Sequence, residues 1–166
     1  CAGLFRNRQF PAQAIKAMIT VKAIAYRTKP KAPMIELEQV EITCESGVVP
    51  DCRGKPGRRQ VTLLSAEAWQ EACAELGSEL PWTFRRANIL IDGLRFSAAD
   101  VGCILRIGDV VLQIMLETDP CPRMDAQHPG LTAALLPNWR AGVCCKVLSS
   151  GTVRIGDAVQ VIGQAT

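Results

Sequence analysis

Short apolar runs separated by turn-forming residues are the feature that most constrains how this chain can fold. Apolar and polar side chains alternate in residues 19–25 and 110–117, which predicts strands, because successive side chains of a strand point to opposite faces. Residues 61–64 and 88–91 predict two shorter buried strands. Glycine, proline, aspartate and serine separate these runs, and no run is long enough to span a bilayer. The pattern therefore predicts a mostly β fold without a membrane span.

Two helices are expected among the strands. Apolar residues recur at helical spacing over residues 66–76, with Ser65 placed as the N-cap and Gly77 as the terminator. A shorter helix is expected over residues 131–136. Many short strands joined by tight corners favour closure of a sheet on itself. The predicted fold is a closed or partly closed β-barrel with one or two inserted helices.

Two regions are expected to be less regular. Residues 35–42 predict one strand with a β-bulge near Glu38-Gln39, because the apolar side chains change phase there. Residues 143–148 and 152–162 predict a closing hairpin around the turn Ser149-Ser150-Gly151. Both predictions concern local chain geometry and the pairing of neighbouring strands.

A Gly-Asp motif occurs twice, as LRIGD in residues 105–109 and VRIGD in residues 153–157. Glycine frees the backbone and aspartate accepts hydrogen bonds from nearby amides, and both properties favour turns. We interpret the two copies as two uses of one turn rather than as a duplication, because the chain lacks the multiple repeats of a solenoid.

Composition limits the classes of function. With 48% hydrophobic and 21% charged residues, the chain is typical of globular proteins, and we expect a single domain over residues 18–166. Residues 1–17 are expected to be a poorly ordered extension or tag, although Cys1-Ala2-Gly3 leaves a lipoprotein start open. The net charge of +3 has no dense basic stripe, which argues against dedicated nucleic-acid binding and leaves local anion binding open.

Cysteine usage points to thiol chemistry rather than disulfides. The eight cysteines are irregularly spaced and no secretory leader is recognisable, which favours reduced thiols in a cytoplasmic protein. Without a C-x-x-C pair, and with His128 as the single histidine, a zinc ribbon or finger lacks ligands.

Cys121 is the candidate reactive cysteine. Pro120 and Pro122 flank it, remove two backbone donors and favour a stiff extended segment that presents the thiol. The charge of nearby Arg123 favours the thiolate, the form that acts as nucleophile, sulfur carrier or metal ligand. The alternative is a small buried core residue.

The ordered motifs of the chain resemble the MOSC domain family, named for the C-terminal domain of molybdenum-cofactor sulfurase. The matching segments are residues 47–54, 59–64, 85–94, 105–109, 118–125 and 142–162. The segment TDPCPRMD, residues 118–125, is similar to the cysteine signature of the family. The resemblance covers nearly all of residues 18–162. One departure is Asp51-Cys52-Arg53, which stands where many relatives place a histidine, so any role of that histidine does not transfer.

The resemblance implies a MOSC-type barrel, similar to the pyruvate-kinase barrel, that works with the molybdenum cofactor. Cys121 would carry sulfane sulfur or ligate molybdenum. Arginines suit a pterin phosphate because they form bidentate hydrogen bonds. The candidate cofactor-binding residues are these arginines and other polar residues of the matching motifs: Arg85, Arg86, Asn88, Thr118, Arg123 and Asp51.

The partners that the resemblance implies are molybdopterin or a sulfur-donor protein, and a redox partner. Some relatives reduce N-hydroxylated compounds when loaded with cofactor, and this is the reaction implied for an enzyme of this kind. Pyridoxal phosphate binding is implied only by the family as a whole and not by particular residues of this sequence.

Two other functions are open from the sequence. Arg85 and Arg86 could line a basic cleft that binds an anionic ligand, a pterin or a partner without turnover, while Cys121 is structural; they could also be a solvated pair. A third hypothesis is a chain that works beside another domain, because larger MOSC proteins carry an additional N-terminal β domain. Ligand binding that survives Cys121→Ser but fails in Arg85→Ala would favour the binding module.

Overall fold

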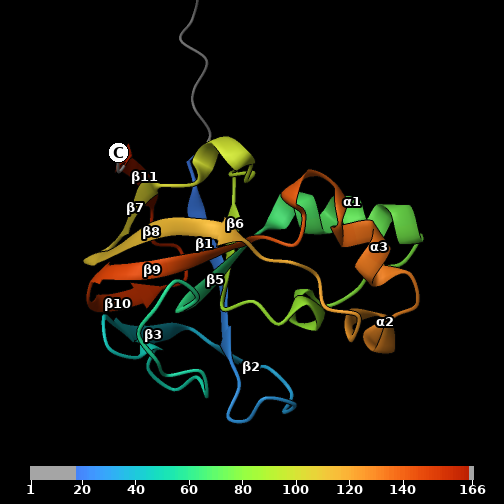
Figure 1. Ribbon diagram of the computed structural model, residues 1–166, viewed down its shortest axis with the longest axis horizontal. Helices are drawn as coiled ribbons and strands as arrows, with labels where there is room; N and C mark the ends of the chain where they lie inside the picture. Colours follow the sequence, from blue (N-terminus) through green and yellow to red (C-terminus); the bar gives the residue numbers. More distant parts are fainter. Residues whose placement is uncertain (1–17, 165–166) are drawn as a thin grey trace, which may run out of the picture.

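The computed structural model describes residues 18–164, and they form a mostly β structure with few helices (Figure 1). The extension predicted over residues 1–17 lies outside the described residues. The strands are β1 (Thr20–Tyr26), β2 (Ile35–Leu37), β3 (Gln39–Thr43), β4 (Gly47–Val48), β5 (Val61–Ser65), β6 (Ile89–Asp92), β7 (Cys103–Ile107), β8 (Val110–Glu117), β9 (Val143–Ser149), β10 (Gly151–Arg154) and β11 (Val159–Gln164). The helices are α1 (Ala66–Leu76), α2 (Met124–Gln127) and α3 (Leu131–Leu135), with 3-10 turns η1 (Trp82–Arg85), η2 (Ala98–Asp100) and η3 (Pro137–Trp139). Helices α1, α2 and α3 gather on one side of the strands (Figure 1).

The strands form two sheets. The larger sheet has eight strands in the order β11-β7-β8-β9-β5-β6-β1-β2, and the smaller one has the order β10-β3-β4. Neighbouring strands are antiparallel except for β5 and β6, which run parallel. A parallel pair requires a crossover connection, and here α1 and η1 lie in that connection. This crossover places η1, which carries Arg85, directly before β6.

The predicted closure into a barrel is not observed, because neither sheet of the described residues closes on itself. The two edges of the large sheet are β11 and β2. The start of β1 does approach the turn before β11, where Val21 N donates to Asp157 O (2.9 Å) and Thr20 forms an isolated bridge with Ala158. Gly156 N also donates to Val21 O (2.8 Å) and Val159 N to Ile19 O (2.8 Å), so the contact reaches the first residue of β11, whereas the ladder of β11 is formed with β7.

One predicted strand and one predicted strand pairing are wrong. Residues 35–42 do not form one bulged strand: the chain leaves β2 at Glu38 and enters β3, so the two halves belong to different sheets. The closing hairpin is also absent, because β9 pairs with β5 and β8 whereas β10 pairs with β3. The predicted strand over residues 152–162 is interrupted by a turn between β10 and β11.

The local predictions are confirmed. Helix α1 spans Ala66–Leu76, the Ser65 side chain caps its first turn, and Gly77 ends it in the left-handed conformation with φ 63°. Helix α3 spans Leu131–Leu135, close to the predicted range. Both Gly-Asp motifs form turns, the first between β7 and β8 and the second between β10 and β11.

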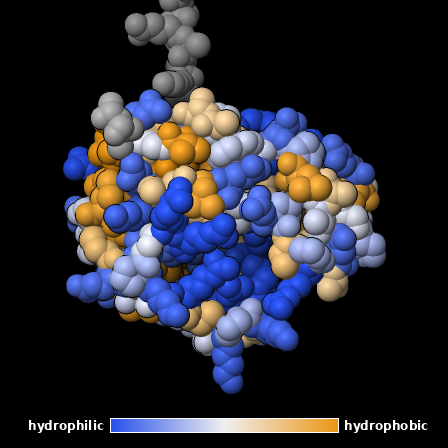
Figure 2. Space-filling view, in the orientation of Figure 1, coloured by the Kyte–Doolittle hydropathy of each residue, from blue (hydrophilic) through white to orange (hydrophobic). Residues whose placement is uncertain are grey.

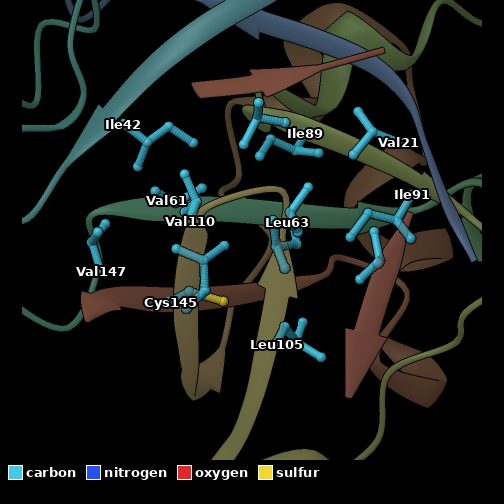
Figure 3. Close-up of a cluster of buried hydrophobic side chains, with 14 of the residues drawn as sticks. Val21, Ile42, Val61, Leu63, Ile89, Ile91, Leu105, Val110, Cys145 and Val147 are labelled. Atoms are coloured by element: carbon cyan, nitrogen blue, oxygen red, sulfur yellow. The ribbon is translucent and has the colours of Figure 1, made fainter. Parts of the chain in front are cut away.

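Apolar side chains form two cores. The main core contains residues from both sheets, including Ile42, Val61, Leu63, Ile89 and Leu105 (Figure 3). The second core packs α1 and α3 against β5 and β6 and includes Leu64, Trp69 and Leu131. The two cores therefore cover opposite faces of the central strands.

Strand β5 shows how this arrangement creates a site. Val61 and Leu63 face the main core, while Thr62 and Leu64 point to the opposite face. Leu64 packs into the core beneath the helices, but Thr62 lines a cavity. The face that carries Thr62 is thus covered by helices over one part and open to a cavity over the other.

Candidate functional site

A cavity of about 610 Å3 lies beside Thr62. Figure 2 shows a hollow near the middle of this face with hydrophilic residues gathered around it. The cavity walls come from the segment after β1, the loop before β5, the turn η1, and the chain from the end of β8 into α2. These segments are far apart in the sequence and meet only in the folded chain.

The cavity is strongly cationic. One acidic side chain, Asp119, lines it. The seven basic side chains that line it are Arg27, Lys31, Arg53, Arg59, Arg85, Arg86 and Arg123. Guanidinium groups bind phosphate and carboxylate oxygens through paired, charge-assisted hydrogen bonds. This excess of positive charge favours a polyanionic ligand and disfavours a free metal cation.

The structure brings most of the predicted site residues together. Five of them line the cavity: Arg85, Arg86, Thr118, Cys121 and Arg123. The other two, Asp51 and Asn88, do not line it, but they hydrogen-bond each other nearby, with Asn88 Nδ2 donating to Asp51 Oδ2 (3.1 Å). These two residues hold parts of the wall in place.

Asn88 and Asp51 connect three segments around the cavity. Asn88 Oδ1 accepts from Thr62 N (3.1 Å) and Nδ2 also donates to Ala25 O (3.3 Å), so one buried amide joins β5 to β1. Asp51 Oδ1 accepts from Arg53 N (3.0 Å), which shapes the turn that carries Cys52. Asp51 and Asn88 are therefore positioning residues in this structure rather than ligand-facing ones.

Arg85 is a buried cation without a matching anion. Its residue is 6% exposed, and its Nε donates to Ala141 O (2.7 Å). Its Nη2 is buried and has no hydrogen-bond partner in the described part of the chain. Burial lowers the pKa of Arg85 to about 10, with Cys144 and Cys121 opposing the shift. The side chain is still a cation at neutral pH, and Arg85 is one of the residues that line the cavity.

Arg86 connects η1 to the segment after β1. Its Nη2 donates to Ala32 O (2.6 Å) and to Pro30 O (3.2 Å), which holds Lys31 at the cavity wall. Its backbone has φ 63°, a conformation that costs energy for a residue with a side chain. Burial lowers the pKa of Arg86, and Arg27 lowers it further, whereas Cys52 opposes the shift.

Cys121 lies in the segment between β8 and α2 with its thiol exposed. Its carbonyl oxygen accepts from Met124 N (2.8 Å) and from Thr132 Oγ1 (3.2 Å), so α2 and α3 hold its backbone. The alternative of a buried core cysteine is therefore wrong for Cys121. The prolines on either side and these two hydrogen bonds keep the segment in place while the side chain lines the cavity.

A close backbone contact holds the start of this segment. Thr118 N donates to Gly142 O (2.9 Å), just before β9. Gly142 has φ 94°, and a Cβ atom there would collide with the carbonyl oxygen of Leu63. Only glycine allows this approach, so Gly142 helps to place Thr118 and, three residues later, Cys121.

The neighbouring cysteines on β9 point to opposite faces. Cys145 belongs to the main core, and burial raises the pKa of its thiol. Cys144 is also buried, but its Sγ lies 3.2 Å from Thr118 Oγ1, behind the cavity wall. The alternation of a strand thus places Cys144 beside Thr118 and Cys145 in the main core.

Several residues of the cavity were not predicted individually. They are Arg27, Lys31, Cys52, Arg53, Arg59, Thr62 and Asp119. The basic residues of the glycine- and proline-rich loop before β5 were the available signal for part of this set. Arg140 does not line the cavity, and its Nη1 lies 2.8 Å from Glu75 Oε1.

A second cavity of about 610 Å3 lies against α1 and has a different lining. Trp69, Trp82 and Leu80 are among its residues. The indole of Trp82 donates to Glu36 Oε1 (2.7 Å), and that of Trp69 donates to Leu80 O (3.1 Å). The polar edges of both indoles are therefore used within the protein, and the cationic cavity is the stronger candidate site.

Neither a ready-made metal cluster nor a membrane helix is found in residues 18–164. No three histidine, cysteine, aspartate or glutamate side chains are grouped there in a way that could hold a metal ion. Within the same range, every helix is too short or too polar to cross a bilayer.

Comparison with known structures identifies relatives of this fold. The structure of YuaD from Bacillus subtilis superimposes with a TM-score of 0.72 at 17% identity, covering 86% of this chain and 94% of YuaD. YiiM from Geobacillus stearothermophilus gives a TM-score of 0.70 at 18% identity, covering 87% and 75% of the two chains. YiiM from Escherichia coli gives 0.68 at 18% identity, covering 89% and 71%. These identities show a shared fold.

The sequence itself matches a known domain family. No curated protein sequence matched the chain. The MOSC domain profile, however, matches residues 46–160, which is more than half of the chain and includes β4 to β10 and the start of β11. The chain therefore belongs to the MOSC domain family.

Proposed function

We propose that the cationic cavity binds the phosphate-bearing pterin of the molybdenum cofactor and that Cys121 supplies sulfur at this site. The observation that carries the proposal is Arg85. A buried guanidinium with an unused Nη2 donor lines a cavity whose other charged side chains are six basic ones and Asp119. A buried charge without a partner costs free energy, and an anionic ligand would remove that cost.

The residues present fit such a cofactor. Arg85 at the end of η1, Arg86 directly after it and Arg123 from the segment after Cys121 would hold the phosphate through charge-assisted hydrogen bonds. Thr62 and Thr118 offer hydroxyl groups on the same wall. The cofactor, when bound, supplies oxidation and reduction at molybdenum.

Cys121 provides the soft ligand that this chemistry requires. A thiolate binds molybdenum or carries sulfane sulfur, whereas the arginines around it bind only the anionic part of the ligand. The family links the chain to the molybdenum cofactor in general terms, and the role of Cys121 as sulfur carrier or molybdenum ligand is the finer part of our proposal. A sulfur-donor protein, molybdopterin and a redox partner are the partners that this function requires.

The proposal is tested on protein produced in cells that make the cofactor. We expect the unsubstituted chain to carry pterin, together with molybdenum or a persulfide on Cys121, measured by elemental analysis, pterin fluorescence and intact mass. Cys121→Ser should keep the pterin and lose the molybdenum or the persulfide. Arg85→Met should lose the pterin. Reduction of N-hydroxylated compounds is the activity to assay in the loaded protein.

Two results would contradict the proposal. Equal loading of molybdenum and persulfide in the unsubstituted and Cys121→Ser proteins would remove Cys121 from the chemistry and leave an anion-binding module. Equal pterin content in the unsubstituted and Arg85→Met proteins would contradict the role of the cavity. Arg140→Met is the matched control, because Arg140 is equally buried but does not line the cavity.

A further inference from the structure

Two thiols line the cationic cavity. Cys52 lies in the loop before β5 and Cys121 in the segment after β8, and both are exposed and free. No other cysteine of residues 18–164 lines this cavity. The positions of the rest exclude a similar role, because Cys73, Cys144 and Cys145 are buried, Cys103 is on β7, and Cys44 lies beside Ser150.

Cys52 is held at the cavity by its own backbone. Its N–H donates to Arg27 O (2.9 Å), and the preceding residue, Asp51, accepts from Arg53 N (3.0 Å) and from Asn88 Nδ2 (3.1 Å). The turn is therefore attached to the end of β1 and to the buried amide of Asn88. Asp51 and Asn88, which do not line the cavity themselves, thereby fix the position of a thiol that does.

The two thiols share the cavity wall with Arg85, the last residue of η1, and with Arg86, which follows it. Burial and Arg27 lower the pKa of Arg86, and Cys52 counteracts them. Burial lowers the pKa of Arg85, and Cys144 and Cys121 counteract it. The two thiols share one cavity with seven basic side chains, and the thiolate is the form of a cysteine that attacks a disulfide or a persulfide.

We propose that Cys52 is a second reacting thiol, which attacks a persulfide on Cys121 and releases its outer sulfur as hydrosulfide into the cationic cavity. The inference rests on the proposed function, specifically on Cys121 as the carrier of sulfane sulfur. The Cys52 thiolate attacks the inner sulfur of Cys121–S–SH. A Cys52–Cys121 disulfide bond forms, the bond to the outer sulfur breaks, and that sulfur leaves with the electron pair as HS⁻.

The reaction balances without a further oxidant. The sulfane sulfur is reduced to hydrosulfide by two electrons while the two thiols are oxidised to a disulfide. A dithiol reductant then restores both thiols for the next cycle. The seven basic side chains would keep the HS⁻ anion in the cavity, where the proposed cofactor binds.

The proposed disulfide sets a geometric requirement for the two segments. A disulfide needs Cα atoms within about 7 Å, so the reaction requires the two segments to approach one another closely. Cys52 and residues 53–59 are all exposed and outside helices and strands, and Cys121 is also outside them. Neither thiol has to leave a regular ladder to react.

The experiment loads the full-length protein with inorganic polysulfide and removes the excess. Hydrosulfide release is then followed without added thiols, and the peptides are mapped by mass spectrometry. We expect the unsubstituted protein to release about one equivalent of hydrosulfide and to form a Cys52–Cys121 peptide, while Cys52→Ser releases it at least about tenfold more slowly until a dithiol is added. Cys44→Ser, which removes an exposed thiol outside the cavity, should behave like the unsubstituted protein.

The outcomes separate this inference from the proposed function. If Cys121 carries a persulfide but Cys52→Ser releases hydrosulfide as fast as the unsubstituted protein, or if the disulfide joins Cys121 to another cysteine, the inference is overturned and the sulfur-carrier function stands. If Cys121 never carries a persulfide in either protein, the sulfur-carrier function itself fails. Because Cys52 is exposed, the serine variant should fold like the unsubstituted protein.

Discussion

Two buried arginines show how differently the protein treats a buried charge in two of its regions. Arg140, 8% exposed, lies against α1, where Glu75 is 2.8 Å from its Nη1 and Glu71 is 3.6 Å from its Nε. Arg85, 6% exposed, lies at the cationic cavity and has no ion pair with any described residue. The two side chains are buried to a similar degree, and they differ in whether a carboxylate of the protein lies beside them.

This difference is the basis for the roles that we propose for the two arginines, a structural one for Arg140 and a ligand-binding one for Arg85. A guanidinium neutralised by carboxylates of its own chain fastens α1 to the segment before β9. A guanidinium left without an anion costs stability, and a protein retains such a cost where a ligand supplies the missing charge. The contrast predicts opposite effects of the same substitution at the two positions.

The largest expected effect is on anion binding by Arg85→Met. We expect the affinity for inorganic pyrophosphate to fall by about 100-fold, because removal of a buried hydrogen-bonded charge costs about 2–5 kcal/mol of binding free energy. Isothermal titration calorimetry measures the affinity of each protein for pyrophosphate. Arg140→Met should bind pyrophosphate like the unsubstituted protein. Similar affinities in Arg85→Met and Arg140→Met would remove the distinction between the two arginines.

The second effect is on stability and has the opposite pattern. Arg140→Met should lower the free energy of unfolding by about 1–2 kcal/mol, a small loss because Glu71 and Glu75 are partly exposed to solvent. Arg85→Met should be neutral or stabilising without ligand, since it removes an uncompensated buried charge. Urea unfolding of both variants decides this, and a larger loss in Arg85→Met than in Arg140→Met would show that Arg85 is structural.

The third effect is a pH dependence that only Arg85 should cause. Burial lowers its pKa to about 10, so the free protein bears the cost of the buried cation below that pH and loses this cost as the pH rises through it. Anion binding should therefore weaken as the pH rises from about 8 to about 11, because the neutral side chain no longer attracts the ligand. The increase in melting temperature on addition of pyrophosphate, measured across this pH range, reports the weakening of binding. The weakening should persist in Lys31→Met and disappear in Arg85→Met.

The smallest effect is expected at the exposed rim of the cavity. Arg59 is exposed, so Arg59→Met should weaken pyrophosphate binding by only about threefold, and added salt should abolish the difference through screening. The loss caused by Arg85→Met should persist in salt, because buried charges are screened less. Equal salt sensitivity of the two variants would mean that Arg85 binds the anion as a surface charge does.

The sequence by itself determined the features that depend on neighbouring residues. Ser65 and Gly77 delimit α1, because a capping side chain and a left-handed glycine act within one helical turn. The two Gly-Asp motifs form turns for the same local reason. Pro120 and Pro122 singled out Cys121, and the order of the motifs indicated the MOSC family, which the profile match over residues 46–160 confirms.

The tertiary structure alone decided which strands pair and which charges meet. Residues 35–42 were predicted as one strand and the end of the chain as one hairpin, and both predictions are wrong because pairing depends on contacts between strands far apart in the sequence. The chain gives no local sign that Arg27 and Lys31 join η1 at one cavity, or that Cys52 lines it with Cys121. Arg85 and Arg140 look alike in the sequence, and only the fold places carboxylates beside Arg140 and leaves Arg85 without one.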